Sequence, residues 1–285
     1  MKKLLIIILP ALLLFSCEQE ITVDLPEVEQ RIVIDGGIFA GENPFVAVTR
    51  SAGYFDPIDS ASLANYVVTN AIVIVSDGSI TDTLTLTFDP NLPVPLVYKS
   101  TLITGQVGRT YFLTVIADGQ TVTSETTILN PIALDSVWFE PDRPGDSLGF
   151  SWARLTDPVG FGNAYRWFAK RSQDARFLTS FGSTFDDQFV DGKTFDFAYI
   201  RAVEDGSTAP EDNNRERGYY KIGDTVIVKF CTIGVNESDF FRTFETEVAN
   251  NGNPFAAPGV IKTNIRNGLG IWCGYSPAYD TIICQ

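Results

Sequence analysis

The chain has 285 residues, a formal net charge of −14 and no histidine. Such an acidic chain, without a lysine or arginine cluster, would be repelled by phosphate backbones, so we expect no nucleic-acid partner. The length allows one large or two ordinary domains, and the lack of histidine removes the usual base of a serine or cysteine nucleophile.

The N-terminus carries an export signal that ends at a cysteine. A positively charged start precedes an apolar run over residues 4–15, and Ser16 is the small residue that stands before Cys17. At a helical rise of about 1.5 Å per residue, this run is too short to cross roughly 30 Å of hydrocarbon. We therefore predict that residues 1–16 are removed and that Cys17 receives a lipid anchor. The alternative is an ordinary secretory signal with an accidental cysteine.

The next segment, residues 17–30, is acidic and contains Pro26. We expect it to form a lipidated tether, whose residues after the cysteine reach about 45 Å when fully extended. Removal of the signal takes away two of the 21 basic residues and none of the 35 acidic ones, so the mature chain has a net charge of about −16.

Residues 31–130 repeat one pattern, in which short runs of β-branched and apolar residues alternate with turn residues. The expected strands are residues 31–34, 45–49, 71–75, 83–88, 96–99, 110–117 and 120–128. The last two flank Asp118-Gly119, which is a strong signal for a two-residue hairpin. Strands without a credible helix predict an all-β, mainly antiparallel fold, here an immunoglobulin- or prealbumin-like β-sandwich.

A second, larger β domain is expected over residues 131–285, because Asn130-Pro131 interrupts strand pairing. Its expected strands are residues 136–140, 147–153, 164–171, 193–202 and 224–233. Three tryptophans are expected in its core, namely Trp138, Trp152 and Trp167.

Helical periodicity is strong at one place in this second domain. A helix is predicted over residues 237–249, with Asn236 as its cap. Its apolar face would hold Phe240, Phe241, Phe244 and Val248. Phenylalanines also recur every four residues from 177 to 189, but the glycine, serine and aspartates between them are poor helix formers. We expect a strand and an irregular loop there.

Besides Cys17, the chain has Cys231, Cys273 and Cys284. Cys231 lies in an apolar run and is expected to be a buried free thiol. Cys273 and Cys284 are the candidates for a disulfide, which would close a short loop and tie down the end of the chain. Without histidine or a CxxC pair, a zinc site is not expected.

Acidic residues cluster in two expected loops of the second domain. The first loop carries Asp186, Asp187 and Asp191, and the second carries Glu204, Asp205, Glu211 and Asp212. Such carboxylates could form a glycosidase-like pair or a calcium site. Neither loop has the ligand spacing of an EF-hand, so we expect solvated loop charge and predict no catalytic residue, no metal and no cofactor beyond the lipid. Calcium is the alternative.

A stretch rich in proline and glycine follows the predicted helix and begins with Asn253, Pro254 and Phe255. These residues, together with Tyr219 and Tyr220, are candidate interface residues, because aromatic side chains serve interfaces as well as cores. The favoured alternative is that the stretch closes the second domain over its core.

Several motifs occur in an order that resembles the DUF4249 family of Bacteroidetes lipoproteins. They are the cysteine-terminated signal, the RIVIDGGI opening, the NAIVIVSDG and GRTYFLTV strands, and the helix followed by the NPF and GLGI segments. The resemblance covers essentially the whole mature chain. It implies a two-domain outer-membrane lipoprotein that accompanies a TonB-dependent receptor barrel, and it supplies no catalytic residue. Glu18 and Glu20 resemble a signal for display at the cell surface.

These observations predict a non-enzymatic, surface-facing outer-membrane lipoprotein that acts as an accessory or ligand-binding partner of a TonB-dependent transporter. The first alternative is a self-standing structural or adhesive envelope lipoprotein. The second, less favoured alternative is a carbohydrate-active enzyme that uses the acidic loop residues.

Overall fold

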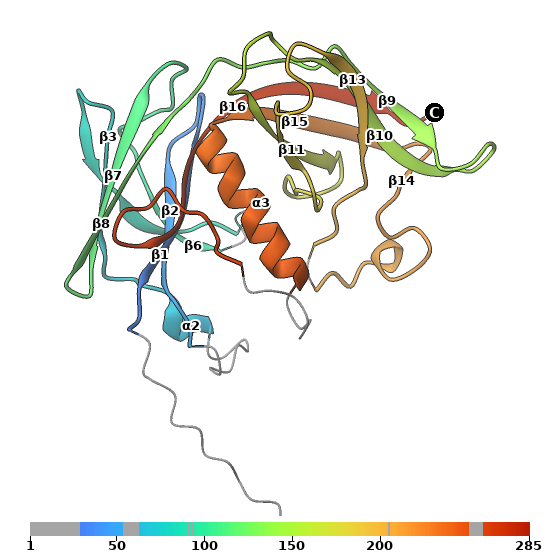
Figure 1. Cartoon of the computed structure of the whole chain (residues 1–285). Coiled ribbons are helices and arrows are strands. Elements are labelled where there is room, and N and C mark those ends of the chain that lie inside the picture. The colour runs from blue at the N-terminus through green and yellow to red at the C-terminus, as the bar shows by residue number, and fades with distance from the viewer. Residues whose placement is uncertain (1–28, 54–62, 91, 93, 205, 251–258) are drawn as a thin grey trace, which may run out of the picture.

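The computed structural model describes residues 29–53, 63–90, 92, 94–204, 206–250 and 259–285. Cys17 and most of the expected tether lie outside these residues, as do Asn253, Pro254 and Phe255. The described chain is mostly β-structure, with α3 (Val235–Asn250) as its long helix (Figure 1). The expectation of a mainly antiparallel β fold is therefore confirmed.

Most strands fall close to their predicted ranges. The strands of the N-terminal half are β1 (Ile32–Phe39), β2 (Phe45–Arg50), β3 (Ile72–Ser76), β4 (Thr81–Thr83), β5 (Thr85–Phe88), β6 (Leu96–Lys99), β7 (Thr110–Ala117) and β8 (Gln120–Thr127), with the short helix α2 (Leu63–Tyr66) after β2. The strands of the C-terminal half are β9 (Ser136–Pro141), β10 (Leu148–Thr156), β11 (Ala164–Arg171), β12 (Thr184–Asp186), β13 (Thr194–Tyr199), β14 (Tyr220–Lys221), β15 (Thr225–Ile233) and β16 (Leu269–Ile283). Of these, β12, β14 and β16 have no counterpart among the predicted ranges.

One eight-stranded sheet runs through the molecule in the order β12-β11-β15-β16-β1-β2-β6-β5. Strand β16 has 15 residues and lies near its centre. Residues 269–275 pair in parallel with β1, and residues 276–283 pair antiparallel with β15. The last strand therefore joins strands from both halves of the chain.

A four-stranded sheet packs against each half of the long sheet (Figure 1). Strands β4, β3, β7 and β8 enclose a first core that includes Tyr111 and Trp272. Strands β9, β10, β13 and β14 enclose a second core that includes Trp167 and Phe230. Helix α3 places Phe241 in a third cluster, against side chains of the long sheet.

The predicted division into residues 31–130 and 131–285 needs a correction at its C-terminal end. The segment between β8 and β9 does lead from the first small sheet to the second. However, Ile265 and Trp272 lie in the first core, and β16 pairs with β1. Local sequence patterns locate strands but do not say which strands pair, so the return of the last strand was not predictable from them.

The β7–β8 hairpin forms at the predicted turn. Ala117 pairs with Gln120, and between them Asp118 and Gly119 have φ angles of 51° and 73°. Positive φ at both central residues is the signature of a type I′ turn, whose twist matches that of the flanking strands. Glycine adopts this conformation freely, and aspartate is among the few other residues that tolerate it.

Helix α3 begins at Val235, so the predicted cap Asn236 lies inside the helix. The predicted apolar face is buried only in part. Phe241 is 8% exposed, whereas Phe244 and Val248 are 45% and 56% exposed. The second half of the helix thus extends past the surface on which it packs. Phe181 and Phe189 lie in turns, Phe185 lies in β12 and Phe177 lies in an irregular segment, which confirms that no second helix forms there.

Of the three tryptophans expected in the second core, only Trp167 is fully buried, at 1% exposure. Trp138 and Trp152 are partly buried cross-strand neighbours on β9 and β10, with ring centroids 6.1 Å apart. Side chains alternate along a strand, and the next β10 residue, Ala153, lies in the second core. The two rings therefore pack on each other on the outer face, and their predicted place in the core is wrong.

The predicted disulfide between Cys273 and Cys284 does not form. Both thiols are free and buried, as is Cys231. Cys273 lies within β16 and Cys284 directly follows it, so the extended backbone, at about 3.3 Å per residue, holds them roughly 35 Å apart. A disulfide requires Cα atoms about 4.4–6.8 Å apart. A bridge needed a turn between the two cysteines, and the structure has one continuous strand there.

Candidate functional site

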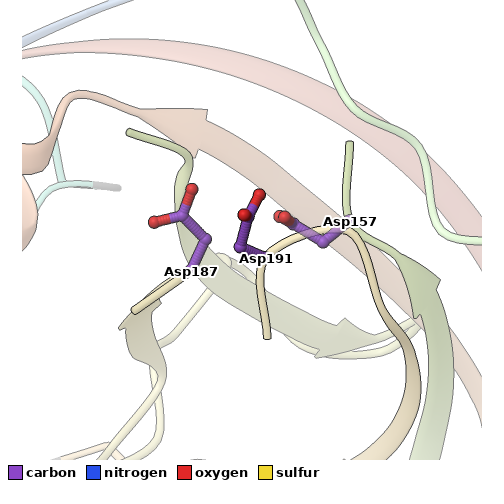
Figure 2. Close-up of side chains that lie close together, drawn as sticks. All are labelled: Asp157, Asp187 and Asp191. Atoms are coloured by element: carbon purple, nitrogen blue, oxygen red, sulfur yellow. The ribbon is translucent and has the colours of Figure 1, made fainter. Parts of the chain in front are cut away.

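Two loops meet at one end of the small sheet that contains β10 and β13. The β10–β11 loop covers residues 157–163 and the β12–β13 loop covers residues 187–193; we call them the paired loops. They bring together Asp157, Asp187 and Asp191, each with a carboxylate oxygen within 4.8 Å of the others (Figure 2). The acidic loop predicted from the sequence supplies two members, and the β10–β11 loop supplies the third.

Backbone N–H groups of the first loop donate to carboxylates of the second. Asp187 accepts hydrogen bonds from Gly162 and Asn163, each with an N–O distance of 2.8 Å. Asp191 accepts one from Gly160 at 2.6 Å. Each of these bonds crosses from one loop to the other, so the carboxylates fasten the paired loops together.

Asp157 is the most deeply buried member of the group, at 2% exposure. It accepts hydrogen bonds from the hydroxyl of Tyr165 and from the N–H of Gly192, the latter at 3.2 Å. Burial raises the pKa of Tyr165 well above its ordinary value of 10.0, and the hydrogen bond to Asp157 and the charge of Asp187 act in the same direction. The phenol therefore stays protonated and remains a donor to Asp157.

The charge of this group limits what it can bind. Three carboxylates so close together repel one another, and within the described ranges no lysine or arginine forms an ion pair with them. An all-oxygen donor set suits a hard cation such as calcium and does not suit zinc. The group offers three of the roughly six to eight ligands that calcium takes, while its hydrogen bonds already give it a structural role.

The other predicted acidic residues are paired with arginines. The ion pairs are Asp186–Arg242, Glu204–Arg176, Glu211–Arg171 and Asp212–Arg201. Asp205 lies outside the described residues. In the part of the chain that the structure describes, none of these carboxylates joins the group in the paired loops.

The pair of Asp212 and Arg201 is buried, with side chains 7% and 5% exposed and an N–O distance of 2.7 Å. Burial by itself would raise the pKa of Asp212, but hydrogen bonds from Ser207 and Arg201 hold it below its ordinary value of 3.8. Because Arg201 also donates to the carbonyl of Tyr219 at 2.8 Å, this pair fastens the 3-10 turn at Pro210–Asp212 to the chain leading into β14.

The two tyrosines predicted at an interface have different places. Tyr220 is 1% exposed and belongs to the second core, so its prediction as an interface residue is wrong. Tyr219 is partly buried, with its ring centroid 5.1 Å from that of Phe150. Neighbouring residues of an extended chain point to opposite sides, which separates the two rings. The roles of Asn253, Pro254 and Phe255 stay predictions.

Sequence reasoning missed Asp157, although a signal for it was present. Ala153 and Leu155 of β10 are fully buried, and the period of two places Asp157 on the same side. An aspartate that follows a strand in phase with its buried residues, directly before a proline, is expected to face inward. Its carboxylate can then hold a neighbouring loop by accepting hydrogen bonds.

An open hollow of about 550 Å³ lies where the described chain begins. Its lining residues are Glu29, Gln30, Arg31, Gln120, Thr121 and Asn267. None of them is a predicted site residue. The hollow adjoins the start of β1, and two of its lining residues, Glu29 and Gln30, lie just before that strand.

The fold and the carboxylate group together define the class of the protein. It is an acidic, β-rich protein in which two cores share one long sheet and paired loops carry clustered aspartates. The chain belongs to the family described as a domain of unknown function (DUF4249), whose family model matches residues 18–280. No curated protein matches the chain. Among the described residues, no helix has the length and apolar character needed to cross a membrane.

Proposed function

We propose that this chain is a non-enzymatic lipoprotein of the outer membrane, displayed at the cell surface, that acts as an accessory or ligand-binding partner of a TonB-dependent transporter. The observation that carries the proposal is Cys17, placed at the end of a short apolar run. Acyl chains on this cysteine, at about 0.8 kcal/mol for each buried methylene, would hold the protein on a bilayer.

The arrangement of the body agrees with an anchor at the N-terminus. The described chain enters β1 at the lower left of Figure 1, beside α2, whereas the paired loops lie at the upper edge of the same view. Residues 17–31 precede β1 and reach roughly 50 Å when extended. An anchor at this end leaves the opposite end of the molecule available to a partner.

Two observations favour binding over catalysis. The chain has no histidine, so the usual general base of a hydrolase is missing. The carboxylates that a glycosidase would need are engaged in arginine ion pairs or accept backbone hydrogen bonds. These contacts give the acidic residues a structural role, which accounts for them without catalysis.

The anchor is tested by Cys17→Ser in the full-length chain, with Ser16→Ala as the matched control, because alanine keeps a small residue before the cysteine. We expect wild type and the control to carry acyl chains by mass spectrometry and to sediment with membranes. Cys17→Ser should carry none. An unmodified thiol in the wild-type protein, or wild-type protein released into culture fluid, would contradict the anchor.

The partner is tested by purification of the anchored protein in mild detergent. We expect a β-barrel receptor to copurify in a stoichiometric amount. A lone monomer would favour the self-standing envelope lipoprotein instead. Hydrolysis of a glycan by the purified protein, lost in Asp186→Asn or Glu211→Gln, would favour the enzyme.

A further inference from the structure

We propose that Val159, Phe161 and Phe189, displayed by the paired loops, form a preorganised docking tip for a protein partner whose apolar pocket is rimmed by lysine or arginine. The proposal rests on exposure, on the hydrogen bonds within the loops and on charge. It depends neither on the lipid anchor nor on the identity of the partner as a transporter.

The three side chains of this docking tip are unusually exposed. Val159 is 90% exposed, Phe161 is 76% exposed and Phe189 is 79% exposed. Single exposed apolar residues are common, but a group of them on adjoining loops marks a contact surface. None of the three contributes to a core cluster, so the fold alone does not explain them.

The loops that carry the docking tip are held in one arrangement. Gly160 and Gly162, which flank Phe161, donate to Asp191 and Asp187 of the other loop. Both glycines have φ near 120°, a backbone conformation that residues with a side chain rarely adopt. The backbone of this loop therefore requires glycine at both positions. Asn163 adds bonds from its side chain to the carbonyls of the same loop. Little conformational entropy is therefore lost when a partner binds.

The two loops are also in contact near their tips. A Cβ atom on Gly192 would lie 3.0 Å from Cγ2 of Val159, so a larger residue there would push against the first loop. The close approach keeps Val159 beside the β12–β13 loop that carries Phe189. The two loops that carry the docking tip therefore lie against each other.

A bilayer is a poor occupant for the docking tip. The paired loops contain three aspartates and a single lysine, so anionic head groups would be repelled. The paired loops also lie at the upper edge of Figure 1, away from the start of β1 at the lower left. A second copy is disfavoured because both copies would carry the same negative charge. A sugar would find no hydrogen-bonding groups on valine and phenylalanine side chains.

A protein partner with an apolar pocket and a basic rim fits both the exposed apolar side chains and the acidic loops. Its apolar pocket would cover the three exposed side chains, and its lysine or arginine groups would meet the acidic loops. Apolar contacts would supply most of the affinity, while the charges would raise the association rate and exclude acidic partners.

The test places the photo-crosslinking residue p-benzoylphenylalanine at position 161 or 189 of the full-length chain, in its native host. Phe88, which is 67% exposed on β5, is the matched control position. We expect positions 161 and 189 to give one shared protein adduct, and position 88 not to give it. The crosslinked peptide of the partner should carry apolar residues beside lysine or arginine. In isolated membranes, raising the salt from about 0.1 to 1 M should reduce the adduct severalfold.

Three results would overturn the proposal: adducts with lipid or with a second copy only, the same adduct from position 88, and no adduct at all. As a second measurement, the triple variant Val159→Ser, Phe161→Ser and Phe189→Ser should lose the partner while its thermal midpoint stays that of wild type, with Phe88→Ser as control. A partner retained by the folded triple variant would also contradict the docking tip. A crosslinked protein partner that is not a β-barrel receptor would support the docking tip and contradict the proposed association with a transporter.

Discussion

Glu237 is a carboxylic acid that the fold has taken out of water. It is 7% exposed in the first turn of α3, accepts a hydrogen bond from Thr126 at 2.7 Å and is contacted by Asn264 at 3.4 Å. Burial raises its pKa above the ordinary value of 4.5, although these hydrogen bonds act in the opposite direction. The side chain links α3 to β8 and carries an electrostatic cost at neutral pH.

This cost has a defined pH dependence. Between pH 4.5 and the higher folded-state pKa, the unfolded chain has released the proton that folded Glu237 retains, so the free energy of unfolding falls as pH rises. Above the folded-state pKa the loss is constant. We expect Glu237→Gln to reduce this fall, as measured by urea unfolding from pH 4.5 to 7.5.

The matched control is Glu125→Gln, because the side chain of Glu125 is 57% exposed. It should leave the pH profile unchanged. A Glu237→Gln profile as steep as that of wild type would show that this carboxyl is not the titrating group.

The residue whose removal should loosen the paired loops most is Asp187. It is 4% exposed and accepts hydrogen bonds from the backbone N–H groups of Gly162 and Asn163, so Asp187→Ala removes two partly buried bonds to a carboxylate. We expect a loss of about 1–3 kcal/mol in the free energy of unfolding. The exposed neighbour Gln188 provides the control, Gln188→Ala, with a loss below about 0.5 kcal/mol.

The same experiment separates hydrogen bonding from cation binding. If the backbone bonds dominate, the loss in Asp187→Ala has the same size in EDTA and in calcium. A loss seen only with calcium present would assign the aspartates to a metal site.

At the scale of elements, strand β16 is the segment that joins the separate parts of the fold. Its alternation serves different surfaces: Trp272 fills the first core, Ile282 the second, and Cys273 the cluster under α3. Trp272 also donates from Nε1 to the carbonyl of Tyr111 at 3.1 Å. A Cβ on Gly36 would lie 2.9 Å from the Trp272 ring, so glycine is needed at this point of β1.

The unbroken strand β16 also predicts the state of the thiols. Cys231, Cys273 and Cys284 should all be free and should react slowly with a thiol reagent until the protein unfolds. Burial raises the pKa of Cys231 to about 12 and that of Cys284 to about 11, so little reactive thiolate is present. Thiols are counted before and after denaturation, with a reduced sample as control. A count that rises by two on reduction would reveal a disulfide.

At the scale of the whole molecule, the shared sheet couples the two cores. We expect Trp272→Ala in the first core and Phe230→Ala in the second to destabilise the protein by about 3–5 kcal/mol each. Because β16 belongs to both cores, each variant should raise hydrogen exchange in β7 and in β11 together. The exposed Phe88→Ala should change neither. Exchange that rises only in the mutated half would show two independent domains.

Much of this architecture follows from short stretches of sequence. The bounds of β7 and β11 agree with their predicted ranges, and the Asp118-Gly119 turn forms as its residues require. Helix α3 agrees to within two residues at its start, because periodicity over four turns is a strong local signal. The paired loops were recognised only in part, since Asp187 and Asp191 stand near each other in sequence and Asp157 does not.

Alternation and turn chemistry act over a few residues, so the sequence by itself determined where most of the strands and the long helix lie and that the fold is mostly β. Pairing is a contact between distant segments, and only the tertiary structure decided that β16 lies between β1 and β15. The tertiary arrangement also decided that Cys273 lies far from Cys284, that Tyr220 is buried and that Asp157 lies beside the other aspartates. Each outcome depends on which surfaces bury each other, and no local pattern encodes that choice.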